Sequence, residues 1–279
     1  MQYDSADLWT HPELFKLDGA KKPYVVAGVP PDYFSKTGQL WGNPIYRWDV
    51  LRQTNYSWWI ERMGHNGSLC DLSRIDHFLG LVAYWEVPAQ EKTAVNGKWV
   101  EAQGEDFLKA LFKKFPFFPL IAEDLGSITP AVREIMHRFE LPVMKVLLFA
   151  FGDDLAANPY VPHNHVPNCV LYTGTHDNNT VRGWFEKDAA PDDRKRLFRY
   201  LGREISAEEV SGEFIRLAMM SVARMVIVPV QDLLGLGPEA RMNTPSTAQG
   251  NWKWKLSPGQ ITPAHADRLR EWTEIYGRA

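Results

Sequence analysis

Three carboxylates stand where predicted β-strands end. Asp76 follows LCDLSRI, Glu123 follows PLIA, and Asp177 follows VLYTGTH. A single Asp in such a place is more often a helix cap or a turn former. Three carboxylates that converge on one barrel mouth, each beside an Arg, His or Asn, instead favour acid, base and nucleophilic catalysis.

Two of these carboxylates have neighbours that indicate different tasks. Arg74 and Asp76 are two residues apart on a strand, hence on one face, where the guanidinium favours an ionised carboxylate suited to nucleophilic attack. The alternative is a structural ion pair that closes a buried strand end. Only one of the neighbours Glu123 and Asp124 can point into a barrel, and we interpret Glu123 as the acid/base and Asp124 as part of the following turn. In retaining glycosidases the two carboxyl groups are about 5–5.5 Å apart, and the nucleophile raises the pKa of its partner.

The elements that must position these groups alternate between strand and helix. Apolar, β-rich runs predict buried strands, and amphipathic segments predict helices at about 105–114, 130–139, 191–201, 206–223 and 264–276. The predicted strands are Val25–Val29, Leu69–Ile75, Leu120–Ala122, Val143–Phe149, Cys169–Thr173 and Met225–Val230. Thr129 before Pro130 is typical of a helix N-cap, and Ser206 with Glu209 is typical of a capping box.

This alternation predicts an α/β fold of the (β/α)8 TIM-barrel type, with the active site at the carboxyl ends of the strands. The predicted strands are fewer than the eight that a closed barrel needs, so we expect an incomplete barrel whose first strands are missing from this chain. No convincing domain boundary is visible. The Gly- and Pro-rich segment 27–44 is interpreted as a long functional loop.

Composition narrows the possible partners. A formal net charge of −3 gives no reason to expect nucleic acid or an anionic membrane as a partner. The two cysteines, Cys70 and Cys169, belong to no metal-binding motif. The sequence shows neither a signal peptide nor an apolar run of membrane-spanning length, and we expect a cytoplasmic protein without a metal or cofactor.

Five segments carry a family resemblance: GVPPDYFSKTGQLWGNPIY, RIDHF, IAEDLG, YTGTHDNNT and RMNTPSTAQGNW. In this order and over nearly the whole chain, they resemble the 4-alpha-glucanotransferases, the amylomaltase or disproportionating-enzyme family (glycoside hydrolase family 77). The resemblance implies that Asp76 is the nucleophile, Glu123 the general acid/base and Asp177 the transition-state stabiliser. Arg74, His176 and Asn178 would bind substrate beside them, although a satisfied core histidine is the alternative for His176.

The same resemblance assigns an acceptor-side loop at about 31–41. Tyr33 and Phe34 would be exposed there for stacking on sugar rings, with Gln39 and Trp41 nearer the reacting groups. The alternative is an ordinary surface Ω-loop.

The family also carries a long N-terminal portion with the first barrel strands. Here YDSADLW, which is similar to the end of the third strand, begins at residue 3. We therefore expect residues 1–279 to be the C-terminal portion of the catalytic barrel, with Asp4 as a substrate-binding residue of that strand. A separate N-terminal half would be a partner.

The predicted reaction is transfer of α-1,4-glucan segments to the 4-hydroxyl of glucose or a maltooligosaccharide, by a retaining double displacement. The ligands would be maltooligosaccharides, amylose, glycogen or starch. One alternative is an α-glucan hydrolase, which uses water as acceptor. The other is a glucan-binding remnant without activity, suggested by the missing N-terminal portion.

Overall fold

The computed structural model describes residues 4–31, 35–126, 128–152, 154–245 and 247–278. The chain divides into two compact units, residues 1–141 and 142–279. The three predicted catalytic carboxylates are shared between them, Asp76 and Glu123 in the first unit and Asp177 in the second.

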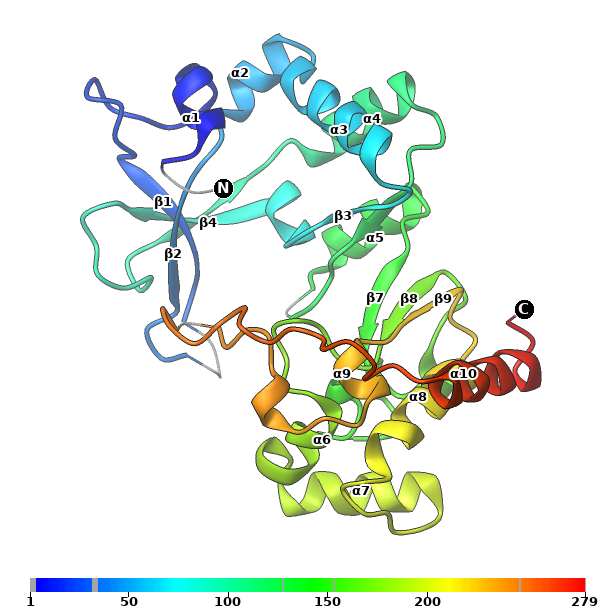
Figure 1. Cartoon of the computed structure of the whole chain (residues 1–279). Helices are drawn as coiled ribbons and strands as arrows, with labels where there is room; N and C mark the ends of the chain where they lie inside the picture. Colours follow the sequence, from blue (N-terminus) through cyan, green and yellow to red (C-terminus); the bar gives the residue numbers. More distant parts are fainter. Residues whose placement is uncertain (1–3, 32–34, 127, 153, 246, 279) are drawn as a thin grey trace. The chain divides into compact units, whose positions relative to one another are not determined.

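The first unit contains an antiparallel sheet with the strand order β2-β1-β4-β5 (Figure 1). Its strands are β1 (Val25–Val29), β2 (Gln39–Pro44), β4 (Ala83–Pro88) and β5 (Lys98–Glu101). The predicted strand at 25–29 is present, but its place in a parallel alternation is wrong, because both of its neighbours are antiparallel. The two ends of the segment 27–44 pair as β1 and β2, and its role as a functional loop stays a prediction.

Gly38 explains how this segment folds back on itself. Its φ is +66°, and a Cβ atom at this position would lie 2.3 Å from the carbonyl oxygen of Val29. Only glycine adopts this conformation at such a close backbone approach without strain. The chain can therefore reverse before β2, where a reading based on composition predicts only a loop.

A parallel pair in the first unit carries two of the predicted catalytic residues. Strand β3 (Ser73–Ile75) pairs with β6 (Leu120–Ala122), with Ser73 opposite Leu120 and Ile75 opposite Ala122. β6 is confirmed as predicted. β3 is shorter than the predicted strand 69–75, because Leu69 still belongs to helix α3 (Ser57–Leu69).

The first unit also contains helices and a group of packed aromatic rings. The helices are α1 (Ala6–Thr10), α2 (Trp48–Gln53), α3, α4 (Gly104–Lys114) and α5 (Pro130–Arg138). Helix α4 buries Phe107, Leu108 and Leu111 on one face, and α5 starts at the predicted cap, where the Thr129 hydroxyl accepts a hydrogen bond from the Val132 amide. An aromatic cluster joins the segment after β2 to α3 and α4 through neighbouring rings of Tyr46, Trp58, Trp59 and Phe107.

The second unit is built on three parallel strands in the order β7-β8-β9. They are β7 (Val143–Val146), β8 (Cys169–Tyr172) and β9 (Met225–Ile227). The predicted strands ran too far at their carboxyl ends, because residues 147–149 form a 3-10 turn and Val230 begins helix α9 (Val230–Leu233). An apolar run alone does not distinguish a strand from the buried turn that follows it.

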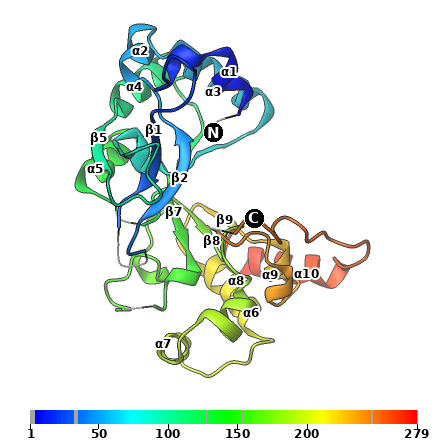
Figure 2. The same cartoon turned by 90° about the vertical axis from the view of Figure 1, so that its left-hand side faces the viewer.

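Helices accompany the strands of the second unit (Figure 2). They are α6 (Val181–Gly183), α7 (Pro191–Leu201), α8 (Val210–Met220), α9 and α10 (Pro263–Ile275). Ile215 and Met219 of α8 pack with Trp272 of α10 in a buried cluster. Helix α8 is shorter than predicted, although Glu209 does accept the expected hydrogen bond from the Ser206 amide, at 2.8 Å.

Parallel strands with accompanying helices confirm the α/β class. Across the described ranges, no helix has both the length and the apolar character needed to cross a membrane.

Candidate active site

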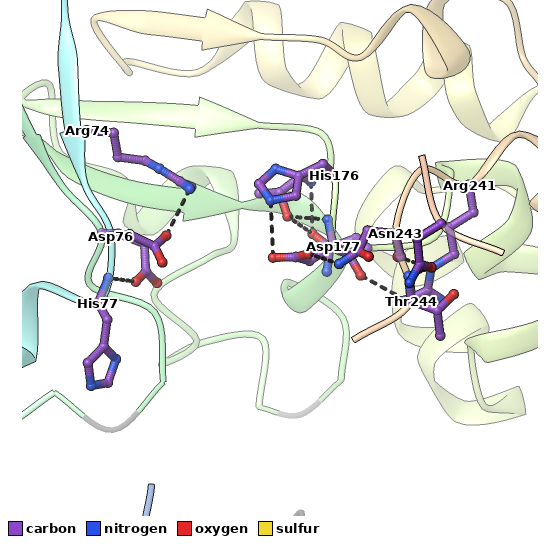
Figure 3. A network of polar contacts seen from close by, with 12 residues as sticks. Arg74, Asp76, His77, His176, Asp177, Arg241, Asn243 and Thr244 are labelled. Carbon is purple, nitrogen blue, oxygen red and sulfur yellow. Dashed lines mark hydrogen bonds and ion pairs between the residues drawn. The ribbon is translucent and has the colours of Figure 1, made fainter. Parts of the chain in front are cut away.

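In the first unit, an exposed carboxylate lies just beyond the end of β3. Asp76 follows Ile75, and its side chain is 77% exposed. Nη2 of Arg74 lies 2.9 Å from Oδ1 of Asp76, as the two-residue spacing predicted (Figure 3). A carboxylate that is both paired and accessible can reach a bound ligand, which a sealed structural ion pair could not.

Glu123 occupies the corresponding place after β6 and is fixed by its backbone and its side chain. Its amide donates to the Ile75 carbonyl at 2.9 Å, and its carbonyl accepts from the Phe78 amide at 3.0 Å. Its carboxylate accepts from two backbone amides, that of His77 at 2.6 Å and that of Leu125 at 3.1 Å. These bonds hold the carboxyl group in one orientation, which a general acid requires.

The electrostatic setting of Glu123 favours a proton on its carboxyl group. Burial of the side chain raises its pKa, and the negative charge of Asp76 raises it further, while the amides of His77 and Leu125 and the Arg74 charge act in the opposite direction. Burial also lowers the pKa of the His77 ring, against the effect of Asp76. The exposed Asp76 and the half-buried Glu123 thus have the different surroundings that a nucleophile and a general acid require.

A cavity of about 420 Å³ in the first unit opens beside Asp76 and His77. Trp41 of β2 lies on its wall, with its ring 4.7 Å from the His77 ring at an interplanar angle of 86°. The Trp41 indole N–H donates to Oε1 of Gln39 at 3.2 Å. Further polar and aromatic lining residues are Asn43, Tyr46, Trp48, Trp59 and Tyr84. Aromatic faces with a few polar groups suit a ring-shaped ligand rich in hydroxyl groups.

In the second unit, the loop after β8 presents Asp177 (Figure 3). Oδ1 of Asp177 accepts a hydrogen bond from Nδ2 of Asn243 at 2.6 Å, and Nε2 of His176 lies 3.4 Å from Oδ2. The Asp177 carbonyl accepts from Nη2 of Arg241 at 2.8 Å. The side chains of His176 and Asp177 are 40% and 48% exposed, so this group too can meet a ligand.

The turn that carries Asp177 is shaped by its own side chains. Oδ1 of Asn178 accepts from both the amide and the hydroxyl of Thr175, each at 2.9 Å. The Asn243 amide donates to the His176 carbonyl at 3.1 Å, and the Trp252 ring lies 5.4 Å from the His176 ring. Asn178 thus stabilises the turn, and its predicted contact with substrate stays a prediction.

Several residues that contact the predicted catalytic groups of each unit were not predicted individually. Arg241 and Asn243 belong to RMNTPSTAQGNW, which drew attention only as a motif. His77 stood unremarked beside Asp76, although its position within RIDHF was available as a signal. Each contacts a predicted catalytic residue that is distant in sequence, a relationship that local patterns do not contain.

The remaining predicted residues are placed as follows. Tyr33 and Phe34 lie outside the described residues. Gln39 and Trp41 belong to β2 and not to a loop, and Asp4 is exposed just before Ser5, the N-cap of α1. Among residues with a described placement, no group of three or more His, Cys, Asp or Glu side chains is arranged to hold a metal ion.

Comparison with known proteins gives consistent matches along the chain. A family model described as 4-alpha-glucanotransferase matches residues 1–262. The chain is 51% identical to the 4-alpha-glucanotransferase of Aquifex aeolicus over 276 residues, which is 99% of this chain and 56% of that protein. It is 52% identical to the Thermus thermophilus protein of the same name over 283 residues, with the same two coverages.

A solved structure agrees with these matches. An amylomaltase from Streptococcus agalactiae in complex with acarbose has a TM-score of 0.94 at 38% identity, covering 99% of this chain and 55% of that one. The chain spans about half the length of the curated relatives it matches. The fold described above is therefore part of the amylomaltase fold.

Proposed function

The chain belongs to the 4-alpha-glucanotransferase family, glycoside hydrolase family 77, and we propose that it carries the catalytic groups for transfer of α-1,4-glucan segments between sugars. The observation that carries this proposal is the difference between two carboxyl groups of one unit. Asp76 is exposed and paired with Arg74, whereas Glu123 is half-buried with a raised pKa.

In the first step, a carboxylate oxygen of Asp76 attacks the anomeric carbon of the donor glucan. The bond from that carbon to the glycosidic oxygen breaks, and Glu123 gives its proton to the leaving oxygen. The raised pKa of Glu123 keeps this proton available, and the His77 and Leu125 amides fix the direction in which it is delivered. The product of this step is a β-glucosyl ester of Asp76.

In the second step, the 4-hydroxyl of an acceptor sugar replaces the ester. The Glu123 carboxylate takes the hydroxyl proton, the new α-1,4 bond forms, and Asp76 leaves as a carboxylate. Two inversions at the anomeric carbon give net retention. Together, the two steps return Glu123 and Asp76 to their starting states.

Asp177 and His176 are assigned to the transition state. As positive charge develops on the sugar ring, the Asp177 carboxylate accepts hydrogen bonds from ring hydroxyl groups, and His176 helps to hold the same ring. Asn243 and Arg241 fix Asp177 through its side chain and its carbonyl. Preorganised groups of this kind stabilise a transition state without reorganising during the reaction.

Transfer requires that a sugar, and not water, reach the glycosyl ester. Trp41 and the other aromatic residues of the cavity beside Asp76 provide stacking surfaces for an acceptor and exclude water. The proposed ligands are maltooligosaccharides and longer α-glucans such as amylose, glycogen or starch. The acarbose complex of the Streptococcus agalactiae amylomaltase supports this substrate class. The proposed location is the cytoplasm.

Incubation with maltotriose tests the proposed function. Transfer yields glucose together with maltooligosaccharides longer than maltotriose, whereas hydrolysis yields only shorter products. The proposal predicts the longer products, and their absence from reactions of folded protein would contradict it. The Asp76→Asn variant is the matched control for contaminating activity.

A further inference from the structure

Asp232 is a buried carboxyl group that the proposed reaction does not use. It lies on the short helix α9, and only 2% of the residue is exposed. A carboxylate in such a position is unfavourable unless polar partners compensate for the lost water. Its two partners are therefore informative about why it is there.

These partners are the two ends of one loop. Oδ2 of Asp232 accepts a hydrogen bond from the Thr173 hydroxyl at 2.6 Å, and Oδ1 accepts from the Val181 amide at 2.8 Å. Thr173 is the first residue after β8, and Val181 is the first residue of α6. The segment between them, residues 174–180, contains His176 and Asp177.

Hydrogen bonds made by the loop's own side chains also fix its conformation. The Thr180 hydroxyl caps α6 by accepting from the Gly183 amide at 2.9 Å, and Asn178 closes the turn through Thr175. Thr173 and Thr180 are both buried, so the two ends of the loop are buried, whereas His176 and Asp177 at its tip are exposed. One carboxyl group thus holds the base, and Asn243 and Arg241 hold the tip.

We propose that Asp232 is a positioning residue that fixes both ends of the 173–181 loop and so sets the Asp177 carboxylate for turnover. The effect on turnover rests on the proposed function, whereas the effect on the loop does not. Burial, which raises the pKa of Asp232 to about 6 against the two hydrogen bonds, is consistent with a group kept for its geometry and not for its charge.

Two variants separate geometry from charge. Asp232→Ala removes both hydrogen bonds. Asp232→Asn keeps an oxygen for the Val181 amide and offers its N–H to the Thr173 hydroxyl, which can accept as well as donate. Leu197→Ala, which removes a buried side chain of α7 in the same unit and leaves a cavity, is the control for a general loss of stability.

Transfer kinetics on maltotriose give the first measurement. Asp232→Ala should lower kcat on the order of 10- to 100-fold with little change in KM, because displaced catalytic groups lose transition-state contacts. Asp232→Asn should remain within about threefold of wild type, and Leu197→Ala should not show the kcat loss at a temperature where it is folded. An Asn variant as impaired as the Ala variant, or an Ala variant as active as wild type, would overturn the proposal.

Hydrogen exchange of the backbone amides gives a second measurement that does not depend on activity. Asp232→Ala should speed exchange in residues 174–181 by roughly tenfold or more, with little change in β7 and α8. Asp232→Asn should leave this segment protected. Exchange unchanged in the Ala variant, or raised equally throughout the unit, would refute the positioning role. A wild-type protein that makes no transfer products would refute the proposed function instead.

Discussion

The backbone amide of His77 donates a hydrogen bond to the carboxyl group of Glu123, with 2.6 Å between the nitrogen and Oε2. His77 directly follows Asp76, so this bond connects the chain segment of the proposed nucleophile to the proposed general acid. The φ angle of His77 is +47°, an uncommon value for a residue other than glycine. Such a conformation is typical of places where function requires a particular backbone geometry.

Removing either carboxyl group should abolish most transfer. Asp76→Asn and Glu123→Gln each take away a group that acts in the chemical step, and we expect losses on the order of 10²-fold or more in kcat with the fold retained. Circular dichroism and kcat on maltotriose are the measurements. Asp124→Asn is the matched control in the same turn. Greater damage from Asp124→Asn than from Glu123→Gln would contradict the assignment.

The pH dependence should follow the protonation of Glu123. Because its pKa is raised in the folded protein, the proton needed for the first step is retained to higher pH and is then lost, so that kcat/KM falls on the alkaline side. The contribution of Glu123 to the free energy of unfolding changes with pH in the same direction. This contribution is fully present below the pKa of Glu123 in the unfolded chain and is lost as pH rises through its pKa in the folded protein. Removing the Asp76 charge should lower the pKa of Glu123, measurable by NMR titration of the carboxyl carbon in Asp76→Asn. An unchanged or higher value would contradict the coupling.

Asp232 should influence stability between about pH 4 and pH 6. Its pKa rises from 3.8 to about 6 on folding, so its contribution is present below pH 3.8 and is lost as pH rises towards 6. The size of the shift corresponds to roughly 3 kcal/mol in the free energy of unfolding. Urea unfolding of wild type and Asp232→Asn should therefore show wild type losing stability relative to the variant over this range. A constant difference would refute the raised pKa.

The contribution of Asp177 to turnover should depend on its hydrogen bond from Asn243. Asn243→Ala removes the 2.6 Å hydrogen bond to Asp177, and we expect kcat to fall about 10- to 100-fold. Asn243→Asp should be at least as harmful, because it places a second carboxylate against the first. Thr247→Ala, on the same segment, is a control whose hydroxyl contacts Thr244 and Asn251 and not Asp177. Full activity of Asn243→Ala would show that Asp177 is fixed by other groups.

Trp41 should affect the fate of the glycosyl ester more than its formation. Trp41→Ala removes a stacking surface beside His77, and we expect the ratio of hydrolysis to transfer to rise several-fold, as about 0.5–1.5 kcal/mol of aromatic contact is lost. Trp99→Ala is a control on β5, because this ring is 49% exposed and packs on Trp85. A ratio of hydrolysis to transfer in Trp41→Ala that equals the wild-type ratio at every acceptor concentration would refute the role of Trp41.

The sequence predicted the strand ends that precede Asp76 and Glu123 better than it predicted the first unit's antiparallel sheet. Asp76 and Glu123 could be placed because each follows a short apolar run, and β6 was predicted to the residue. Strand β1 could not be assigned to the correct sheet, since its partner β4 is about 60 residues away in the sequence and its apolar run resembles a parallel strand.

Long-range polar partners were equally inaccessible to sequence analysis. Asn243 and Asp177 are separated by 66 residues, and Asp232 and Thr173 by 59. Nothing local distinguishes Asp232 in PVQDLL from an exposed helical residue, because its burial depends on segments distant in sequence, among them α8, which contacts α9, and Thr173. Periodicity describes which face a residue occupies but not which distant group it meets.

The most direct test of the account is to trap the glycosyl ester. With α-maltosyl fluoride as donor, fluoride leaves without a proton from an acid, so the Glu123→Gln variant can form the ester but lacks the base that speeds its transfer. Mass spectrometry of the digested protein should show one maltosyl unit on the peptide that contains Asp76, together with a stoichiometric burst of fluoride. A fluoride burst with the sugar attached elsewhere, or with no attached sugar, would contradict the assignment of Asp76 as the nucleophile.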